Sequence, residues 1–386
     1  MFKKSLLALS VGAALVSVAQ AEPLKIGFIT TLSTPAGYLG EDARDAFKLA
    51  LKQKDGKLGG IDVELIVEDD ALKPANGKQA VDRMLSNGVE LFTGVTFSNV
   101  LAAVVPSIIK ENKTYISLNP GPSVFAGKRC SPNYFVAAYQ NDYYHSAGGA
   151  AANEVGYDKV VLLAPNYQAG RDAINGFKSS YKGEIVAEIY TSLEQADFSV
   201  EIARIRSLNP DAIYQFHPGG LGINFAKQYG NSGLNDTVPM IMPGFSMDAR
   251  MIEATGQVAE DFYIVSHWAL TSELPLSQQF VQDFQAEYGR VPTEYAMVAY
   301  DTALWYDSAI SKVGGDISDK EKFHEALKEH DFKSLRGTFS LANNQHPILD
   351  YYLLQLKKDD SGELRPQIVR KVIEQGTDNF AVQCEM

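Results

Sequence analysis

The sequence predicts an α/β fold with two doubly wound lobes, each a parallel sheet covered on both faces by helices. Short apolar segments of strand character alternate with helical segments over residues 24–117, and the same order restarts at residue 159. Alternation at this spacing is typical of parallel sheets. The chain of 386 residues is also longer than the roughly 250–300 residues that one core supports, which favours two domains.

Each expected element follows from local composition. Strands are expected where aliphatic runs end in polar or glycine-rich turns, and helices where apolar residues recur at helical spacing. The first series has strands at 24–31, 61–67, 91–95 and 114–117 and helices at 40–53, 75–87 and 98–111. The second has strands at 159–164, 184–190, 212–216, 240–242 and 262–265, helices at 169–179, 198–207 and 222–230, later helices at 277–288, 294–313 and 319–329, and paired strands within 336–356.

Two such lobes on one chain leave a cleft between them. We expect lobe 1 to contain residues 22–141 and 267–345 and lobe 2 to contain residues 142–266 and 346–386, so that the chain crosses a hinge three times. Ligands of open parallel sheets bind beyond the carboxyl ends of the strands. The strand-end loops of both lobes are therefore where we expect a binding site.

The first 21 residues have the three-part pattern of a secretory signal peptide. Lys3 and Lys4 precede an apolar run over residues 6–18, and a small-x-small sequence ends at Ala21, as a signal peptidase requires. The run is shorter than the ~18 apolar residues of a membrane helix. We expect cleavage near Ala21 and a soluble protein in an oxidising compartment outside the cytoplasm.

The acidic balance of the chain excludes several partners. The net charge is −12, and it becomes more negative on cleavage because the removed segment carries two lysines and no acid. Nucleic acid requires a basic surface, and anionic lipid attracts basic segments. We therefore expect neither as a partner, and we expect a monomer.

Cys130 and Cys384 are the two cysteines of the chain. A small, even number in an oxidising compartment favours one disulfide, which would tie the C-terminus to a loop in the middle of the chain. Two unpaired thiols are the alternative. No Cys or His stands at ligand spacing near either cysteine in the sequence, which makes a metal site a poor interpretation. We expect no metal and no cofactor.

Polar turns and aromatic rings follow the expected strands. Ser98 begins a helix, where it is suited both to cap the helix and, with the free N–H groups, to receive an anion. The stiff turn 119–123 offers a hydroxyl and amides to a carboxylate. A single ring is equally suited to a core, but their clustering favours a cleft lined by rings. These aromatic residues are Tyr143, Tyr144, Tyr167, Phe216, Phe245, Trp268 and Tyr295, with His217 beside them.

The residues assemble no catalytic motif. Of the six histidines, only His217 follows an expected strand beside the cleft. No Gly-x-Ser-x-Gly elbow precedes a helix, and no Gly-x-Gly-x-x-Gly sequence follows a strand. His217 is better explained as a hydrogen-bond donor to a ligand or as a structural residue than as a base. We expect a binding protein and not an enzyme.

These features resemble the leucine/isoleucine/valine-binding type of periplasmic solute-binding protein, the receptor component of an ABC importer. The resemblance implies a type I periplasmic binding protein fold, a periplasmic location, capture of a ligand by hinge closure, and a permease partner in the inner membrane. It spans the mature chain and rests on segments 25–27, 94–99, 119–123, 167–170 and 298–302. Segments 96–100, 130–133, 140–142, 337–339 and 343–344 resemble more narrowly the branch that takes up benzoate- and cinnamate-like acids.

The resemblance also implies roles for single residues. Ser98 and the amide of Asn99 would hold a ligand carboxylate, joined by Gly121 and Ser123. Amino-acid-binding relatives place an acid on the second lobe to pair with the ligand ammonium, and Phe245 aligns with that position. Enclosing an unpaired ammonium costs about 3–5 kcal/mol, whereas burying a ring against Phe245 contributes about 2–4 kcal/mol. We therefore expect a carboxylate ligand with an apolar, aromatic body.

Other ligand classes stay open. Asp142 would restore a partner for an ammonium, which would make the protein a branched-chain amino acid receptor. Short amides and linear carboxylates are further candidates within solute binding. A sensory ectodomain is an alternative of another kind, and the lack of an apolar segment long enough to span a membrane argues against it.

Overall fold

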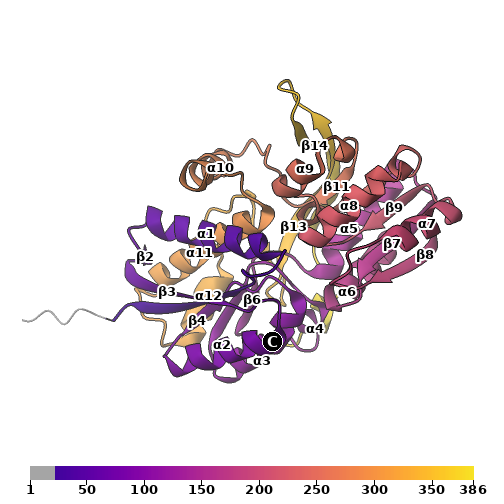
Figure 1. The fold of residues 1–386 in the computed structure, drawn as a ribbon. Helices are drawn as coiled ribbons and strands as arrows, with labels where there is room; N and C mark the ends of the chain where they lie inside the picture. The colour runs from indigo at the N-terminus through magenta and orange to yellow at the C-terminus, as the bar shows by residue number, and fades with distance from the viewer. Residues whose placement is uncertain (1–21) are drawn as a thin grey trace, which may run out of the picture.

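The structure, a computed structural model, describes residues 22–386, and the expected signal peptide lies outside this range. Two sheets lie side by side, each covered by helices (Figure 1). Their carboxyl-end loops meet where the chain passes from one sheet to the other. This architecture confirms the predicted α/β fold with two wound units.

The first sheet and its helices come from two separate stretches of chain. Its strand order is β2-β3-β1-β4-β5-β6, parallel except for the edge strand β2. Helices α1 and α11 pack together over this sheet. The elements are β1 (Leu24–Thr30), α1 (Gly37–Gln53), β2 (Lys57–Leu58), β3 (Ile61–Asp69), α2 (Pro74–Ser86), β4 (Leu91–Thr93), α3 (Ser98–Lys110), β5 (Thr114–Ser117), α4 (Ser123–Ala126), β6 (Tyr134–Val136), α10 (Pro275–Tyr288), α11 (Glu294–Lys312) and α12 (Lys320–Lys328).

The second sheet has eight strands. Its order is β12-β13-β11-β10-β9-β7-β8, and β14 pairs with β13. The strands β7 to β11 run parallel, whereas β13 is antiparallel to β11. The elements are α5 (Asn141–Val155), β7 (Lys159–Pro165), α6 (Gln168–Ser180), β8 (Glu184–Thr191), α7 (Ser199–Leu208), β9 (Ala212–Gln215), α8 (Gly220–Asn231), η1 (Leu234–Asp236), β10 (Met240–Pro243), η2 (Gly244–Ser246), α9 (Ala249–Thr255), η3 (Gly256–Ala259), β11 (Tyr263–Ser266), β12 (Ser340–Leu341), β13 (Pro347–Lys358) and β14 (Leu364–Gly376).

Several elements of the structure were not predicted, and for three of them, β6, α5 and β14, the physical reason is clear. Strand β6 has only three residues. Helix α5 contains Gly148 and Gly149, which have low helix propensity but allow close packing, since a Cβ on Gly149 would lie 2.3 Å from the carbonyl oxygen of Phe177. Strand β14 extends beyond the covered sheet with Ile368 and Val369 about half exposed, so it lacks the apolar alternation of a half-buried strand.

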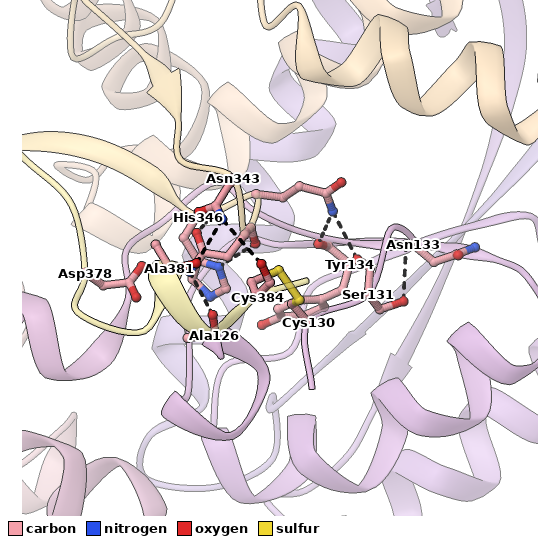
Figure 2. Close-up of a disulfide and its surroundings, with 12 residues drawn as sticks. Ala126, Cys130, Ser131, Asn133, Tyr134, Asn343, His346, Asp378, Ala381 and Cys384 are labelled. Carbon is pink, nitrogen blue, oxygen red and sulfur yellow. Dashed lines mark hydrogen bonds between the residues drawn. A yellow bond between two sulfur atoms is a disulfide. The ribbon is translucent and has the colours of Figure 1, made fainter. Parts of the chain in front are cut away.

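A disulfide joins Cys130 to Cys384, as predicted, and closes a loop of 254 residues. The surrounding segments share side-chain hydrogen bonds (Figure 2). Asn343 Nδ2 donates to the carbonyl oxygen of Ala381 at 2.9 Å, and Asn344 Nδ2 donates to that of Ala126 at 2.9 Å. The C-terminal 3-10 turn η4 (Ala381–Gln383) is therefore held beside the loop that follows α4 in the first sheet.

Replacing both cysteines by serine should lower the free energy of unfolding by about 2–5 kcal/mol, because a loop this long loses much conformational entropy in the unfolded chain when it is cross-linked. Urea denaturation with and without dithiothreitol measures the effect. The double variant is the matched control, since its midpoint should not respond to the reductant. A wild-type midpoint that stays constant while both thiols become alkylated would contradict this prediction.

Candidate ligand-binding cavity

A cavity lies where the carboxyl ends of the strands of the two sheets meet. The first sheet contributes residues that follow β4, β5 and β6 and one residue of α11, and the second contributes α5 and the loops after β7, β9 and β10. The cavity is narrow, and the centre of a water molecule could occupy only about 20 Å³ of it. Its lining residues are Thr96, Phe97, Ser98, Asn119, Pro120, Tyr139, Asn141, His145, Tyr167, Ala169, Pro218, Phe245 and Tyr295.

The polar end of the cavity is the N-terminus of α3. The amide N–H groups of Ser98 and Asn99 donate no hydrogen bond within residues 22–386, as expected for the first residues of a helix. Ser98 Oγ accepts a hydrogen bond from Asn141 Nδ2 at 3.2 Å, which leaves its own hydrogen for another acceptor. These donors and the positive end of the helix dipole favour an anion here.

Phe245 lies at the centre of a cluster of rings on the opposite wall. Its ring stacks on that of Tyr139, with centroids 5.4 Å apart and planes at 10°. The rings of His145 and Tyr295 meet it edge to face at 5.9 Å and 6.5 Å. Such contacts are favourable for aromatic pairs. The cavity is therefore polar at the α3 end and aromatic elsewhere.

A buried polar group holds the turn that carries Phe245. The Tyr144 hydroxyl accepts a hydrogen bond from the Gly244 amide at 3.1 Å and lies 3.2 Å from both carboxyl oxygens of Glu294. Ser266 also donates to Glu294. Burial raises the pKa of Glu294 to about 7, and these two hydrogen bonds oppose that shift. The carboxyl group thus lies directly beneath the ring cluster.

Known proteins share this architecture. A family model described as periplasmic binding protein matches residues 23–362. The chain belongs to the periplasmic binding protein family. The solute-binding proteins in this family serve ABC transporters and are not enzymes, and the family implies a periplasmic location, a small-molecule ligand and a membrane permease partner. Among residues 22–386, no helix combines the length and the apolar character needed to cross a bilayer.

Individual relatives differ in the ligands that their names state. A Leu/Ile/Val-binding protein homolog 6 of Brucella melitensis is 26% identical over 99% of this chain and 100% of its own length. An R. palustris solute-binding protein, solved with benzoate, is 28% identical with a TM-score of 0.89 over 95% of this chain and 100% of its own. Another, from Rhodopseudomonas palustris BisB5 and solved with 3,4-dihydroxybenzoic acid, is 26% identical with a TM-score of 0.85 over 92% and 99%. The aromatic-acid branch of the resemblance is thereby supported.

In this periplasmic binding protein the turn 119–123 does not present all its donors to the cavity. The Ser123 hydroxyl donates to Asp172 Oδ1 at 2.8 Å, and the Ser123 amide donates to Asp172 Oδ2 at 3.3 Å. The Gly121 amide donates to Asn141 Oδ1 at 3.0 Å. Both residues were expected to hold a ligand carboxylate. The structure instead directs Ser123 to a carboxylate of α6, so neither residue lines the cavity.

Four more residues expected at the site lie outside the cavity, namely His217, Tyr143, Phe216 and Asp142. His217 is fully buried behind it, hydrogen-bonded to Thr191 and Gln215 at 3.0 Å and 2.9 Å, and burial lowers its pKa to about 3. Its neighbour Pro218 lines the cavity instead. Tyr143 packs edge to face on Tyr351 at 6.0 Å, on the side of α5 turned away from the cavity.

Phe216 and Asp142 are placed differently again. Phe216 stacks behind Tyr167 at 6.2 Å and supports the wall without lining it. Asp142 accepts a hydrogen bond from Gln140 Nε2 at 2.9 Å and does not line the cavity. Burial, and next the charge of Asp172, raise the pKa of Asp142. The carboxyl is therefore poorly suited to serve as an ionised partner for an ammonium.

Sequence reasoning missed several residues of the cavity wall. Thr96 and Asn119 stand within segments already selected as strand ends, so their place was within reach. Asn119 Nδ2 donates to the Thr96 carbonyl oxygen at 2.5 Å and its Oδ1 accepts from the Tyr139 hydroxyl at 3.1 Å. Tyr139 and His145 follow β6, the strand too short to be predicted, and so gave no signal, whereas Asn141 stands within segment 140–142 of the family resemblance.

Contacts between the two sheet units close the cavity at its rim. The Tyr38 hydroxyl of α1 donates to Asp248 Oδ2 at 2.8 Å. Arg250 pairs with Asp42 at 3.0 Å, and its guanidinium lies 4.8 Å from the centre of the Tyr38 ring. A wider groove of about 590 Å³ lies beyond Arg250 and Arg290. It is away from the strand ends, and both arginines are already paired with Asp42.

The stability of the ligand-free protein should fall as pH rises from about 4.5 to about 7, in part through Glu294. Its pKa is raised in the folded state to about 7, so the folded state holds the proton more tightly than the unfolded chain and gains stability only at low pH. In Glu294→Gln the free energy of unfolding should fall by about 1–3 kcal/mol less over this pH interval than in wild type. Thermal melting from pH 4 to pH 8 measures it.

Glu273→Gln, at an exposed position, is the control and should leave the pH profile unchanged. Equal slopes for wild type and Glu294→Gln would contradict the assignment.

Proposed function

We propose that the protein captures a small aromatic carboxylate, benzoate- or cinnamate-like, by hinge closure and delivers it to an ABC permease. One observation carries the proposal: among residues 22–386, no acidic side chain lines the cavity. The ligand carboxylate would bind the Ser98 hydroxyl and the amides of Ser98 and Asn99, and its ring would lie among Phe245, Tyr139 and Tyr167.

A cavity wall without an acidic side chain favours a carboxylate that has no amine over an amino acid. An ammonium enclosed without a carboxylate partner costs about 3–5 kcal/mol, which corresponds to a loss of hundreds- to thousands-fold in affinity. A buried aromatic ring contributes about 2–4 kcal/mol through its apolar area. The benzoate and 3,4-dihydroxybenzoic acid complexes of the two structural relatives support the same ligand class.

Closure depends on how the lobes divide. We propose that lobe 1 comprises 22–141 and 267–345 and lobe 2 comprises 142–266 and 346–386, since the chain changes sheet near these limits. The contacts of Tyr38 with Asp248 and of Asp42 with Arg250 join the two units across the rim. They would form as the lobes close on the ligand and break on release to the permease.

A branched-chain amino acid receptor is the second candidate. The Brucella melitensis relative, which carries a Leu/Ile/Val-binding name and matches the full chain, favours it. Asp142 and Asp172 lie near the cavity and could approach an ammonium only if the network around Ser123 rearranged. The two candidates differ in a measurable way.

Thermal-shift and calorimetric titration of the mature protein should show binding of benzoate, hydroxybenzoates or cinnamate and none of leucine, isoleucine or linear dicarboxylates. A ligand present at about 100 times its dissociation constant stabilises a protein by roughly 2.7 kcal/mol, which is readily detected. Strong stabilisation by leucine with none by any aromatic acid would overturn the proposal in favour of the second candidate.

Phe245→Glu should weaken binding of the aromatic acid at least about tenfold, because the variant replaces a ring contact by a charge that repels the ligand. Phe245→Leu keeps the site apolar and should weaken binding less. Tyr190→Glu, on the exposed side of β8, is the control for an added charge. Unchanged affinity in Phe245→Glu, measured by calorimetry, would show that this ring does not contact the ligand.

A further inference from the structure

His145 brings a polar atom to the aromatic wall of the cavity. It lies in the second turn of α5, is 1% exposed and lines the cavity. The rings of Phe216 and Phe245 surround it at 5.1 Å and 5.9 Å. The other side chains that the second sheet unit brings to the cavity are Asn141, Tyr167, Ala169, Pro218 and Phe245. The amide of Asn141 is already hydrogen-bonded to Ser98, Asp172 and the Gly121 amide, so the imidazole and the Tyr167 hydroxyl are the remaining polar side-chain groups among them.

The hydrogen bonding of His145 determines which ring nitrogen carries the proton. His145 Nδ1 lies 2.6 Å from the hydroxyl oxygen of Tyr214. Tyr214 is 2% exposed, and its hydroxyl has no other hydrogen-bond partner within residues 22–386. A buried O–H without an acceptor is costly, so the hydroxyl donates and Nδ1 accepts. Burial lowers the pKa of His145 to about 3, and a neutral imidazole that accepts at Nδ1 carries its hydrogen on Nε2.

The Nε2–H group points to the cavity. It makes no hydrogen bond within residues 22–386, and it is not sealed off as the two unpaired ring nitrogens of His267 are. It therefore presents a donor, and only a donor, to whatever the cavity encloses. The α3 amides that would receive the carboxylate belong to the other sheet unit, whereas the His145 ring lies against Phe216 and Phe245 in the aromatic part of the cavity.

We propose that the Nε2–H of His145 donates a hydrogen bond to an oxygen on the ring of the bound acid, which makes ring-oxygenated aromatic carboxylates (hydroxy or methoxy acids) the preferred ligands. This inference rests on the proposed function. A ligand with an unsubstituted ring would leave the donor unpaired in a closed cavity, which a site built to hydrogen-bond an oxygen discriminates against. An ammonium at this position would meet a second donor and find no acceptor.

Calorimetric titration with benzoate, 3- and 4-hydroxybenzoate and 4-methoxybenzoate tests the inference. Wild type should bind the best oxygenated acid at least about tenfold more tightly than benzoate. His145→Phe keeps a ring but removes the donor, so it should abolish this preference, and benzoate and the oxygenated acids should then bind with similar affinity. His330→Phe, at the end of α12 and away from the cavity, is the matched control and should retain the preference.

Tyr214→Phe tests the tautomer without altering the imidazole. It frees Nδ1 from its donor, so the proton can move to Nδ1 and the preference for oxygenated acids should shrink. Nitrogen-15 NMR of the histidine rings in wild type should show His145 neutral and protonated at Nε2. This signature needs no ligand, and it also keeps the inference testable if His145→Phe fails to fold.

Several outcomes overturn the inference, and they differ from failure of the proposed function. If benzoate binds as tightly as the oxygenated acids, or His145→Phe keeps the preference, the role of His145 is wrong while an aromatic carboxylate remains the ligand. A proton on Nδ1 of His145 in the wild-type spectrum has the same meaning. If leucine binds and no aromatic acid does, both the role of His145 and the proposed function are wrong.

Discussion

The Tyr144 hydroxyl joins the segments that build the cavity, and the position of Phe245 depends on it. Its oxygen accepts a hydrogen bond from the Gly244 amide and lies within hydrogen-bond distance of the Val265 carbonyl oxygen and the Glu294 carboxyl group. One atom therefore links α5, η2, β11 and α11. A Cβ on Gly244 would lie 2.7 Å from Glu294 Oε1, and the turn approaches this closely because residue 244 is glycine. A polar contact, as well as apolar packing, thus fixes the aromatic wall.

The two sheets divide the chemistry of the cavity between them. The first supplies free amides and a hydroxyl at the N-terminus of α3 and the rings of Phe97, Tyr139 and Tyr295. The second supplies the rings of Tyr167 and Phe245 and one imidazole donor. Asp172 reinforces this division, because its carboxylate takes the hydroxyl and amide of Ser123. The turn after β5 therefore joins the two sheet units, and the N-terminus of α3 is the favourable position that remains for the anion of a ligand.

Much of the fold follows from the sequence, whereas the site follows only in part. Covered parallel strands such as β1 and β7 are mostly apolar, so their place was evident from composition. The N-terminus of α3, and Phe245, Tyr167 and Tyr295, were accessible because each stands at a strand end or near the hinge. Side-chain direction was not: His217 and Pro218 are adjacent, yet only Pro218 lines the cavity. Nor could periodicity show that Asp172, distant in sequence, would occupy the donors of Ser123.

The position of the disulfide has a consequence for biogenesis. Cys384 lies 254 residues after its partner Cys130. An exported chain that emerges from its N-terminus first would present one thiol long before the other. The bond would therefore form only once residue 384 has crossed the membrane, and a chain that stalls before that point would lack this covalent closure.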